Sequence, residues 1–203
     1  MSSRQGDVLL TGTTGFVGME LLARYLERQH GERRIVALVR AATDEAARAR
    51  VDAVLENLFG SRAGLHRDRV EAFAADLTAP GLGLESELRD RLACRVSTIV
   101  HSAATVSFTL PLEEARAINV QGTRRMLEFA ELAAACGGLR RYGHVSTAYV
   151  AGTHSGSFAE RDLELGQTFH NSYERSKFEA EQLVRSRARE LPTTILRPSI
   201  VVG

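Results

Sequence analysis

The sequence predicts a doubly wound α/β fold, in which a parallel sheet carries helices on both faces. Short runs rich in aliphatic residues recur along the 203 residues, and stretches with helical periodicity follow them. The runs show little alternation of polar and apolar residues, as expected for strands buried on both faces. The first run is followed directly by a glycine-rich turn, and ligands bind such sheets at the carboxyl ends of their strands.

The elements follow in a regular order. In the first half we expect strands and helices in turn: a strand at 7–12, a helix at 16–29, a strand at 33–40, a helix at 44–59, a strand at 69–77 and a helix at 84–93. In the second half we expect a strand at 97–104, a long helix at 111–135, a strand at 140–150, a helix at 172–190 and a strand at 193–202. Thr43 or Asp44 would cap the second helix. The stretch 151–170 is long for a connection and predicts a mobile loop at the active site.

Composition limits the classes of function. Net charge is +1 and 44% of the residues are hydrophobic, which is typical of one soluble globular domain with no nucleic-acid partner. No apolar run approaches the ~18 residues of a membrane span. The two cysteines, Cys94 and Cys136, give no disulfide framework and favour a reduced, cytoplasmic location. The histidines lack metal-ligand spacing, so no metal site is predicted, and His101 and His144 are interpreted as satisfied core residues.

The turn "TGTTGFVG" places Gly12, Gly15 and Gly18 between the first strand and the first helix. The first glycine permits a tight turn, the second lets the backbone approach a pyrophosphate, and the third lets the helix pack on the sheet. The helix N-terminus adds free N–H donors for phosphate. Together these features predict a dinucleotide site, although the spacing differs from G-x-G-x-x-G.

The end of the second strand distinguishes the two nicotinamide dinucleotides. NAD sites usually place a carboxylate there, whereas this strand ends in Arg40 and has no carboxylate before Asp44. A guanidinium offers a planar fork of donors to a 2′-phosphate. Arg50 could add a second cation, and Arg48 is as close in sequence. The pattern therefore favours NADP(H).

The stretch "NSYERSK" places Tyr173 and Lys177 one helical turn apart, after Asn171 or Ser172 as a cap. Such a pair is either surface decoration or a proton donor beside the cation that lowers the pKa of its phenol. The local sequence leaves both interpretations open.

The sequence resembles the extended short-chain dehydrogenases/reductases. The segments that carry the resemblance span the chain in family order: "TGTTGFVG", "ALVRAATDEAARARV", "AADLT", "HSAATVSF", "INVQGT", "HVSTAYV", "YERSK" and "LRPSIVVG". Within that superfamily it is most similar to fatty acyl-CoA reductases and thioester-reductase domains, the male-sterility-type NAD-binding domains. The resemblance implies one NADP-binding Rossmann domain over residues 1–203, without the C-terminal segment that covers the substrate in that family.

The resemblance also implies residue roles. Thr147, Tyr173 and Lys177 would form the catalytic trio, with Thr147 preferred over Ser146. The cofactor would contact the turn, the two arginines and the later strand ends: Gly12, Thr13, Thr14, Gly15, Phe16, Val17, Arg40, Arg50, Asp76, Leu77, Ser102, Ala103, Ala104, Asn119, Tyr173, Lys177 and Pro198. Asn119 would support the backbone of the active site.

The resemblance therefore implies an NADPH-dependent reductase of acyl thioesters, on CoA or a carrier protein, that yields aldehyde or alcohol. A nucleotide-sugar epimerase or dehydratase would share the trio and the glycine turn. A third possibility is a non-catalytic NADP-binding protein, which would have no reason to keep the trio. The sequence gives no signal for an oligomeric state.

Overall fold

A parallel sheet forms the centre of the computed structural model, which describes residues 6–28 and 33–202. Within these residues the sheet has six strands in the order β3-β2-β1-β4-β5-β6. Their bounds are β1 Asp7–Thr11, β2 Ile35–Val39, β3 Val70–Ala74, β4 Val96–His101, β5 Arg141–Val145 and β6 Thr193–Leu196. All neighbouring strands pair in parallel. The predicted doubly wound parallel sheet is therefore confirmed.

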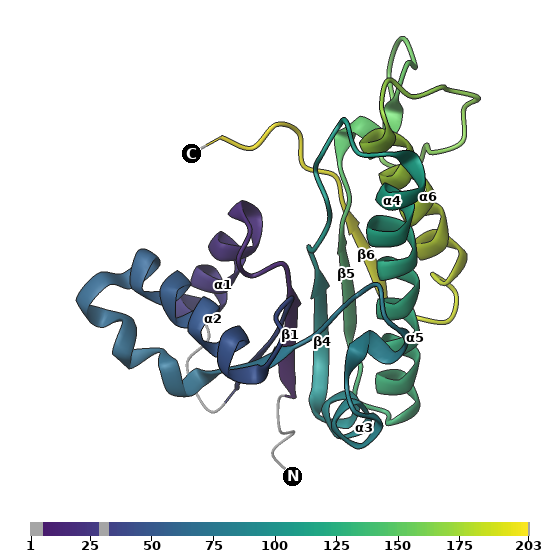
Figure 1. The fold of residues 1–203 in the computed structure, drawn as a ribbon. Coiled ribbons are helices and arrows are strands. Elements are labelled where there is room, and N and C mark those ends of the chain that lie inside the picture. Colours follow the sequence, from purple (N-terminus) through teal and green to yellow (C-terminus); the bar gives the residue numbers. More distant parts are fainter. Residues whose placement is uncertain (1–5, 29–32, 203) are drawn as a thin grey trace.

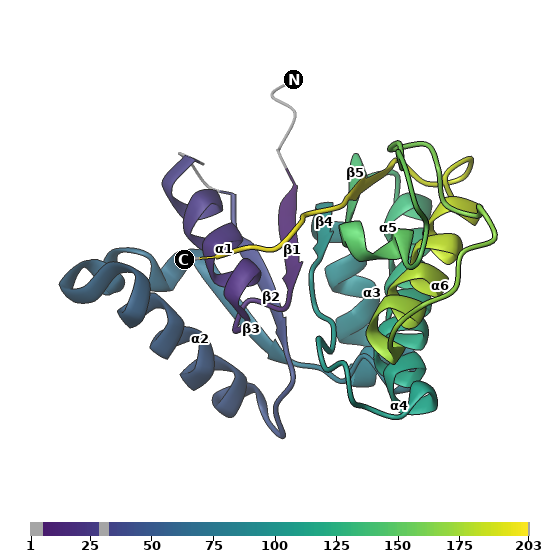
Figure 2. The same ribbon diagram turned by 90° about the horizontal axis from the view of Figure 1, so that it is seen from above.

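Helices cover both faces of the sheet (Figure 1). One face carries α1 (Phe16–Arg28) and α2 (Asp44–Phe59), and the other carries α3 (Ser86–Arg95), α5 (Gly122–Ala135) and α6 (Ser172–Ser186). The view from above shows the same two layers, with the short α4 (Leu112–Arg116) on the side of α5 and α6 (Figure 2). Short 3₁₀ turns lie at Gly60–Leu65, Arg67–Arg69, Pro80–Gly83 and Ala148–Ala151.

The alternating residues of β1 divide the core in two. Val8 and Leu10 pack with Leu22 of α1, whereas Leu9 packs with Met126 of α5. Because successive side chains of a strand point to opposite faces, a continuous apolar run is what a sheet covered on both sides requires.

Several element ends differ from the sequence prediction. The expected helix 111–135 is interrupted by a π-helical turn at Ala117–Gln121. The fifth strand ends at Val145 and the sixth at Leu196, and the backbone that follows Leu196 contains Pro198, which cannot donate to a ladder. Gln29, the expected last residue of the first helix, and Gly203, the last residue of the segment "LRPSIVVG", lie outside the described residues.

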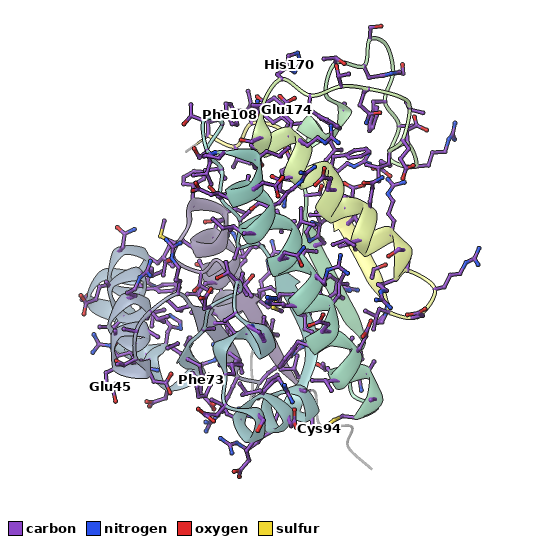
Figure 3. The ribbon with its side chains drawn as sticks, turned by 45° about the vertical axis from the view of Figure 1, so that its right-hand side comes forward. Glu45, Phe73, Cys94, Phe108, His170 and Glu174 are labelled. Carbon is purple, nitrogen blue, oxygen red and sulfur yellow. A yellow bond between two sulfur atoms is a disulfide. The ribbon has the colours of Figure 1, made fainter. Side chains whose placement is uncertain are left out.

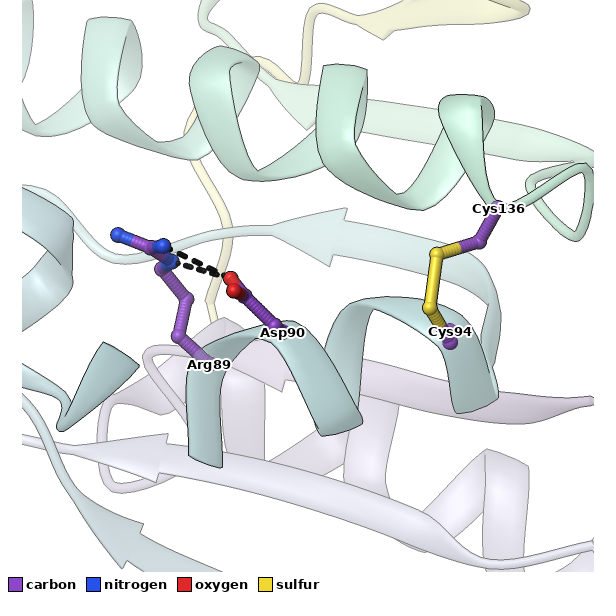
Figure 4. Close-up of a disulfide and its surroundings, with 4 residues drawn as sticks. All are labelled: Arg89, Asp90, Cys94 and Cys136. Atoms are coloured by element: carbon purple, nitrogen blue, oxygen red, sulfur yellow. Dashed lines mark hydrogen bonds and ion pairs between the residues drawn. A yellow bond between two sulfur atoms is a disulfide. The ribbon is translucent and has the colours of Figure 1, made fainter. Parts of the chain in front are cut away.

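Cys94 and Cys136 form a disulfide between the C-terminal ends of α3 and α5 (Figure 4). Their Cα atoms lie 5.2 Å apart, although the residues are 42 positions apart in sequence. The prediction that the two cysteines form no disulfide is therefore wrong for this structure. Packing of α3 against α5 brings the two thiols together, and the sequence alone does not show that contact.

Within the described part of the chain, no helix combines the length and apolar character that a membrane span requires.

Candidate active site

A cavity of about 910 Å³ opens at the carboxyl ends of the strands. Segments that follow all six strands line it, together with the first turns of α6. The sequence-predicted residues in its wall are Gly12, Thr13, Thr14, Gly15, Phe16, Val17, Arg40, Arg50, Asp76, Leu77, Ser102, Ala103, Ala104, Thr147, Tyr173, Lys177 and Pro198. The structure thus gathers residues from across the chain at one site.

The glycine turn is held by close backbone contacts. Gly12 has φ of 76°, and a Cβ there would lie 2.8 Å from the amide nitrogen of Ala103. A Cβ on Gly18 would lie 1.9 Å from the carbonyl oxygen of Gly12. Neither position tolerates a side chain. Thr13 is buried and belongs to the cavity wall, and its hydroxyl has no partner among the described residues.

Of the two predicted arginines, Arg40 follows β2 directly and Arg50 lies on α2. Arg40 is exposed and lines the cavity. Arg50 donates to the carbonyl oxygen of Arg40 and, over 3.1 Å, to the hydroxyl of Thr14. It therefore joins this strand end to the glycine turn. Arg48 instead donates to the carbonyls of Val70 and Arg67 and is absent from the cavity wall, so Arg50 is the one of the two that lies at the cavity.

Asp76 lies in the part of the cavity wall that follows β3. Its carboxylate accepts from the hydroxyl and the amide of Thr78, at 2.7 and 2.8 Å. Both hydrogen bonds lower the pKa of Asp76, and the bond from the hydroxyl has the larger effect. The carboxylate is therefore held as an anion in this part of the cavity wall.

Helix α6 carries two of the three catalytic candidates. Asn171 caps it, since its side chain accepts from the amide of Glu174 at 2.9 Å. Tyr173 falls in the first turn and Lys177 one turn later, on the face toward β5. The Lys177 ammonium is buried and donates to the carbonyl of Val145 at 2.7 Å.

The electrostatics differ from the expectation. Burial raises the pKa of Tyr173, and its hydrogen bond with Thr147 opposes that rise. Burial lowers the pKa of Lys177 to about 8, against the attraction of Glu181. The predicted lowering of the pKa of Tyr173 by Lys177 is not what this structure shows, because burial of the phenol has the largest effect on its pKa and raises it.

Asn119 supports the site without lining its cavity. The π-helical turn carries this side chain, which accepts from the amide of Thr105 at 2.8 Å. It also donates to the Thr105 carbonyl at 3.1 Å and to the hydroxyl of Ser176 at 2.9 Å. Its predicted support of the backbone agrees with these contacts, whereas direct cofactor contact is not supported.

Sequence reasoning missed a buried carboxylate beneath the trio. Glu181 accepts from the hydroxyl of Ser146 at 2.6 Å and from the guanidinium of Arg197 at 2.6 Å. Arg185 donates to the same carboxylate at 3.0 Å. Burial opposes ionisation, yet Arg197 and Ser146 keep the pKa of Glu181 low. Its position one turn after Lys177 was the available signal, because both then share a helical face.

The stretch 151–170 is tied to the body of the protein. Arg185 donates to carbonyls of Glu160, Arg161 and Asp162, and Arg197 to those of Ala159 and Asp162. None of its residues lines the cavity. The cavity therefore gives no support to an active-site loop here, and the predicted mobility of this stretch stays a prediction.

An aromatic group flanks the trio. The ring of Phe108 lies 5.6 Å from that of Tyr173 and 6.2 Å from that of Tyr149. Phe108 is half exposed and lies at the same end of the molecule as His170 and Glu174 (Figure 3). Tyr149, which the sequence did not single out, lines the cavity.

The parallel sheet, the glycine turn and the cavity at its carboxyl edge define an NAD(P)-binding domain of the dehydrogenase/reductase type. A family model described as "Male sterility protein" matches residues 10–203. The chain therefore belongs to the Male sterility protein family, within the extended short-chain dehydrogenases/reductases, and is an NAD(P)-binding domain of the thioester-reductase type.

Curated relatives cover nearly the whole chain. It is 36% identical to an isonitrile lipopeptide synthase of Streptomyces coeruleorubidus over 97% of this chain and 13% of the relative. It is 34% identical to a carboxylic acid reductase of Segniliparus rugosus over 100% of this chain and 18% of the relative. It is 31% identical to the fatty acyl-CoA reductase wat of Drosophila melanogaster over 100% of this chain and 44% of the relative. The chain thus spans less than half the length of these relatives.

Solved structures agree. The terminal R domain from the myxalamid PKS-NRPS pathway has a TM-score of 0.85 and 32% identity, over 100% of this chain and 50% of that one. The R domain of a non-ribosomal peptide synthetase from Mycobacterium tuberculosis has a TM-score of 0.80 and 31% identity, over 97% of this chain and 48% of that one. UDP-glucuronic acid 4-epimerase from Bacillus cereus shares the fold alone. Its TM-score is 0.71 and its identity 21%, over 97% of this chain and 57% of that one.

Proposed function

We propose that residues 1–203 form the NADPH-binding domain of a reductase that acts on acyl thioesters, carried by CoA or by a carrier protein, and yields aldehyde or alcohol. The observation that supports this most is the position of Thr147, Tyr173 and Lys177 in the wall of the cavity that the glycine turn also lines. Relatives whose names contain acyl-CoA reductase and carboxylic acid reductase support the substrate class.

The site fits a phosphorylated dinucleotide. The bare backbone at Gly12 suits a pyrophosphate placed before the start of α1, where the helix N-terminus offers free N–H donors. Arg40, whose guanidinium lines the cavity, would bind the 2′-phosphate, while Arg50 holds the Arg40 backbone and Thr14 in place. NADPH, when bound, would supply the hydride.

Side chains of the trio would bind and protonate the carbonyl oxygen of the substrate. Thr147 and Tyr173 both line the cavity, so their hydroxyls could donate to a thioester carbonyl and stabilise the oxyanion as negative charge develops. Tyr173 would then deliver its proton. Its pKa is raised by burial, which keeps the phenol protonated until it is needed. Lys177 would hold ribose hydroxyls, a role that its buried position beside β5 permits.

One observation speaks against each of the two alternative functions. A nucleotide-sugar epimerase would share the fold, but Arg40 occupies the place where an NAD enzyme usually has a carboxylate. A binding-only protein would not need Thr147, Tyr173 and Lys177 in one cavity.

The test is oxidation of NADPH by the purified protein, followed at its absorbance, with long-chain acyl-CoA and with acyl carrier protein thioester. Aldehyde or alcohol is then identified by mass spectrometry. Oxidation with either thioester supports the proposal, and the faster of the two identifies the carrier. Conversion of UDP-sugars without net NADPH oxidation would contradict it.

We also propose a cytoplasmic location. The Cys94–Cys136 bond is the observation against it, because disulfides are rare in reducing compartments. Alkylation of the protein in freshly lysed cells, followed by mass spectrometry, would find both thiols free if the location is right and bonded if it is wrong.

A further inference from the structure

A buried chain of hydrogen bonds runs beneath the cavity, centred on His101 at the end of β4. The Nδ1 atom of His101 lies 2.8 Å from the hydroxyl of Thr11, at the end of β1. Its Nε2 atom lies 3.2 Å from the hydroxyl of Thr123 on α5. The His101 side chain is 2% exposed, so water cannot replace these partners.

The direction of these hydrogen bonds follows from the partners of Thr11 and of Thr123. At one end, the amides of Ser102 and Ala103 donate to the Thr11 hydroxyl oxygen at 3.2 and 3.1 Å. They occupy both of its lone pairs, so its proton must point to Nδ1 of His101. At the other end, the Thr123 hydroxyl donates to the carbonyl of Asn119 at 2.7 Å. Its oxygen can then accept from Nε2.

Both ends therefore require the same state of the ring. We infer that His101 is a positioning residue, held as the neutral tautomer with its proton on Nε2, which locks the glycine turn and the Ser102–Ala103 wall together for the dinucleotide. A charged ring would place a third donor on Thr11. Burial and the nearby charge of Lys177 also lower the pKa of His101 to about 3.

The locked segments are the two sides of the proposed dinucleotide site, on which this inference rests. The amide of Ala103, which Thr11 holds, lies 2.8 Å from the place where a Cβ on Gly12 would be. Asn119 extends the chain further, since its amide group donates to Ser176, whose hydroxyl donates to the carbonyl of Tyr173. The same network thus reaches the helix that carries the trio.

His144, the neighbour of His101 on β5, offers a contrast. Their rings lie 5.6 Å apart, yet neither ring nitrogen of His144 has a partner in the described part of the chain. The sequence interpretation of satisfied histidines is therefore confirmed for His101 and wrong for His144. Only His101 has the bonding pattern that fixes a tautomer.

The first test is nitrogen NMR of the ligand-free protein with labelled histidine, because the chemical shift separates protonated from unprotonated ring nitrogens. The signals of His101 are assigned by their loss in His101→Gln. We expect Nε2 protonated and Nδ1 unprotonated at pH 7. A proton on Nδ1, or exchange between both tautomers, would overturn the inference without touching the proposed function.

The second test measures NADPH binding by calorimetry in Thr11→Val and Thr11→Ser. The valine variant leaves the two half-buried amides of Ser102 and Ala103 without an acceptor, so the dissociation constant should rise roughly 5- to 150-fold. The serine variant keeps the hydroxyl and should stay close to the wild type.

Ser97→Ala is the matched control. Ser97 is a buried hydroxyl at the other end of β4 that donates to the carbonyl of Gly6 at 2.9 Å. We expect it to lower the melting temperature without changing NADPH affinity. If Thr11→Val behaves in the same way, the network is merely structural and the positioning role is wrong. If the wild type binds no NADPH, the proposed function fails, while the NMR result still decides the tautomer.

Discussion

Arg40 is the residue on which the proposed choice of cofactor depends. It lines the cavity from the end of β2, while the neighbouring Arg50 is committed to the backbone of Arg40 and to Thr14. Replacing Arg40 by Ala should remove charged hydrogen bonds worth ~1.5–3 kcal/mol and weaken NADPH binding by about 10- to 150-fold. NADH binding should barely change. Calorimetry with both dinucleotides measures this, and Arg124→Ala on the exposed side of α5 is the control. Equal losses for the two cofactors would mean that Arg40 does not contact the 2′-phosphate.

Tyr173 and Tyr149 place two phenols in one cavity, which allows a matched comparison. Tyr173→Phe removes the hydroxyl that contacts Thr147, so turnover with an acyl thioester should fall about 10²- to 10⁴-fold, the usual contribution of a general acid. NADPH affinity should survive. Tyr149→Phe should keep most of the turnover. The reverse order of effects, measured as kcat for both variants, would move the proton donor from Tyr173 to Tyr149.

At the scale of elements, Glu181 joins three segments. It lies on α6, holds Ser146 after β5 and pairs with Arg197 after β6. The carboxylate is fully buried, so Glu181→Ala should leave an uncompensated guanidinium and lower the free energy of unfolding by ~3–5 kcal/mol. Urea denaturation measures the change.

Glu179→Ala is the control for that experiment, since Glu179 pairs with Arg116 and Arg175 at the more exposed side of α6. Partly exposed ion pairs contribute about 0–1 kcal/mol, so its loss should be small. Similar losses for both variants would show that Glu181 stabilises the helix locally and does not join it to β5 and β6.

At the scale of the whole molecule, the sequence predicts the sheet well because strand runs, helix periods and a glycine turn are local patterns. It also identifies Tyr173 and Lys177, whose spacing places them on one helical face. The contacts of Glu181 with Ser146, and of Cys94 with Cys136, join residues 35 and 42 positions apart. They arise only when helices pack, so no local pattern reports them. The bond between Lys177 and Val145 likewise depends on how α6 lies on β5.

The burial of Lys177 makes the stability of the whole molecule depend on pH. The pKa of Lys177 is about 8 in the folded protein and 10.5 when unperturbed, so the unfolded chain binds more protons between these values. Stability must then rise with pH across this window. Below about pH 8 the buried ammonium costs ~3 kcal/mol, since each pKa unit corresponds to ~1.4 kcal/mol.

Lys177→Met cannot titrate and fills the same space, so it isolates this effect. Without ligand, the variant should be more stable than the wild type by ~3 kcal/mol at pH 7, and the difference should shrink toward pH 10.5. Urea denaturation at several pH values measures both curves, and all other titrating groups are common to the two proteins. A difference that stays constant with pH would mean that Lys177 keeps its ordinary pKa in the fold. A variant that is more stable but binds NADPH weakly would show that the protein tolerates an unfavourable buried charge for the sake of its cofactor site.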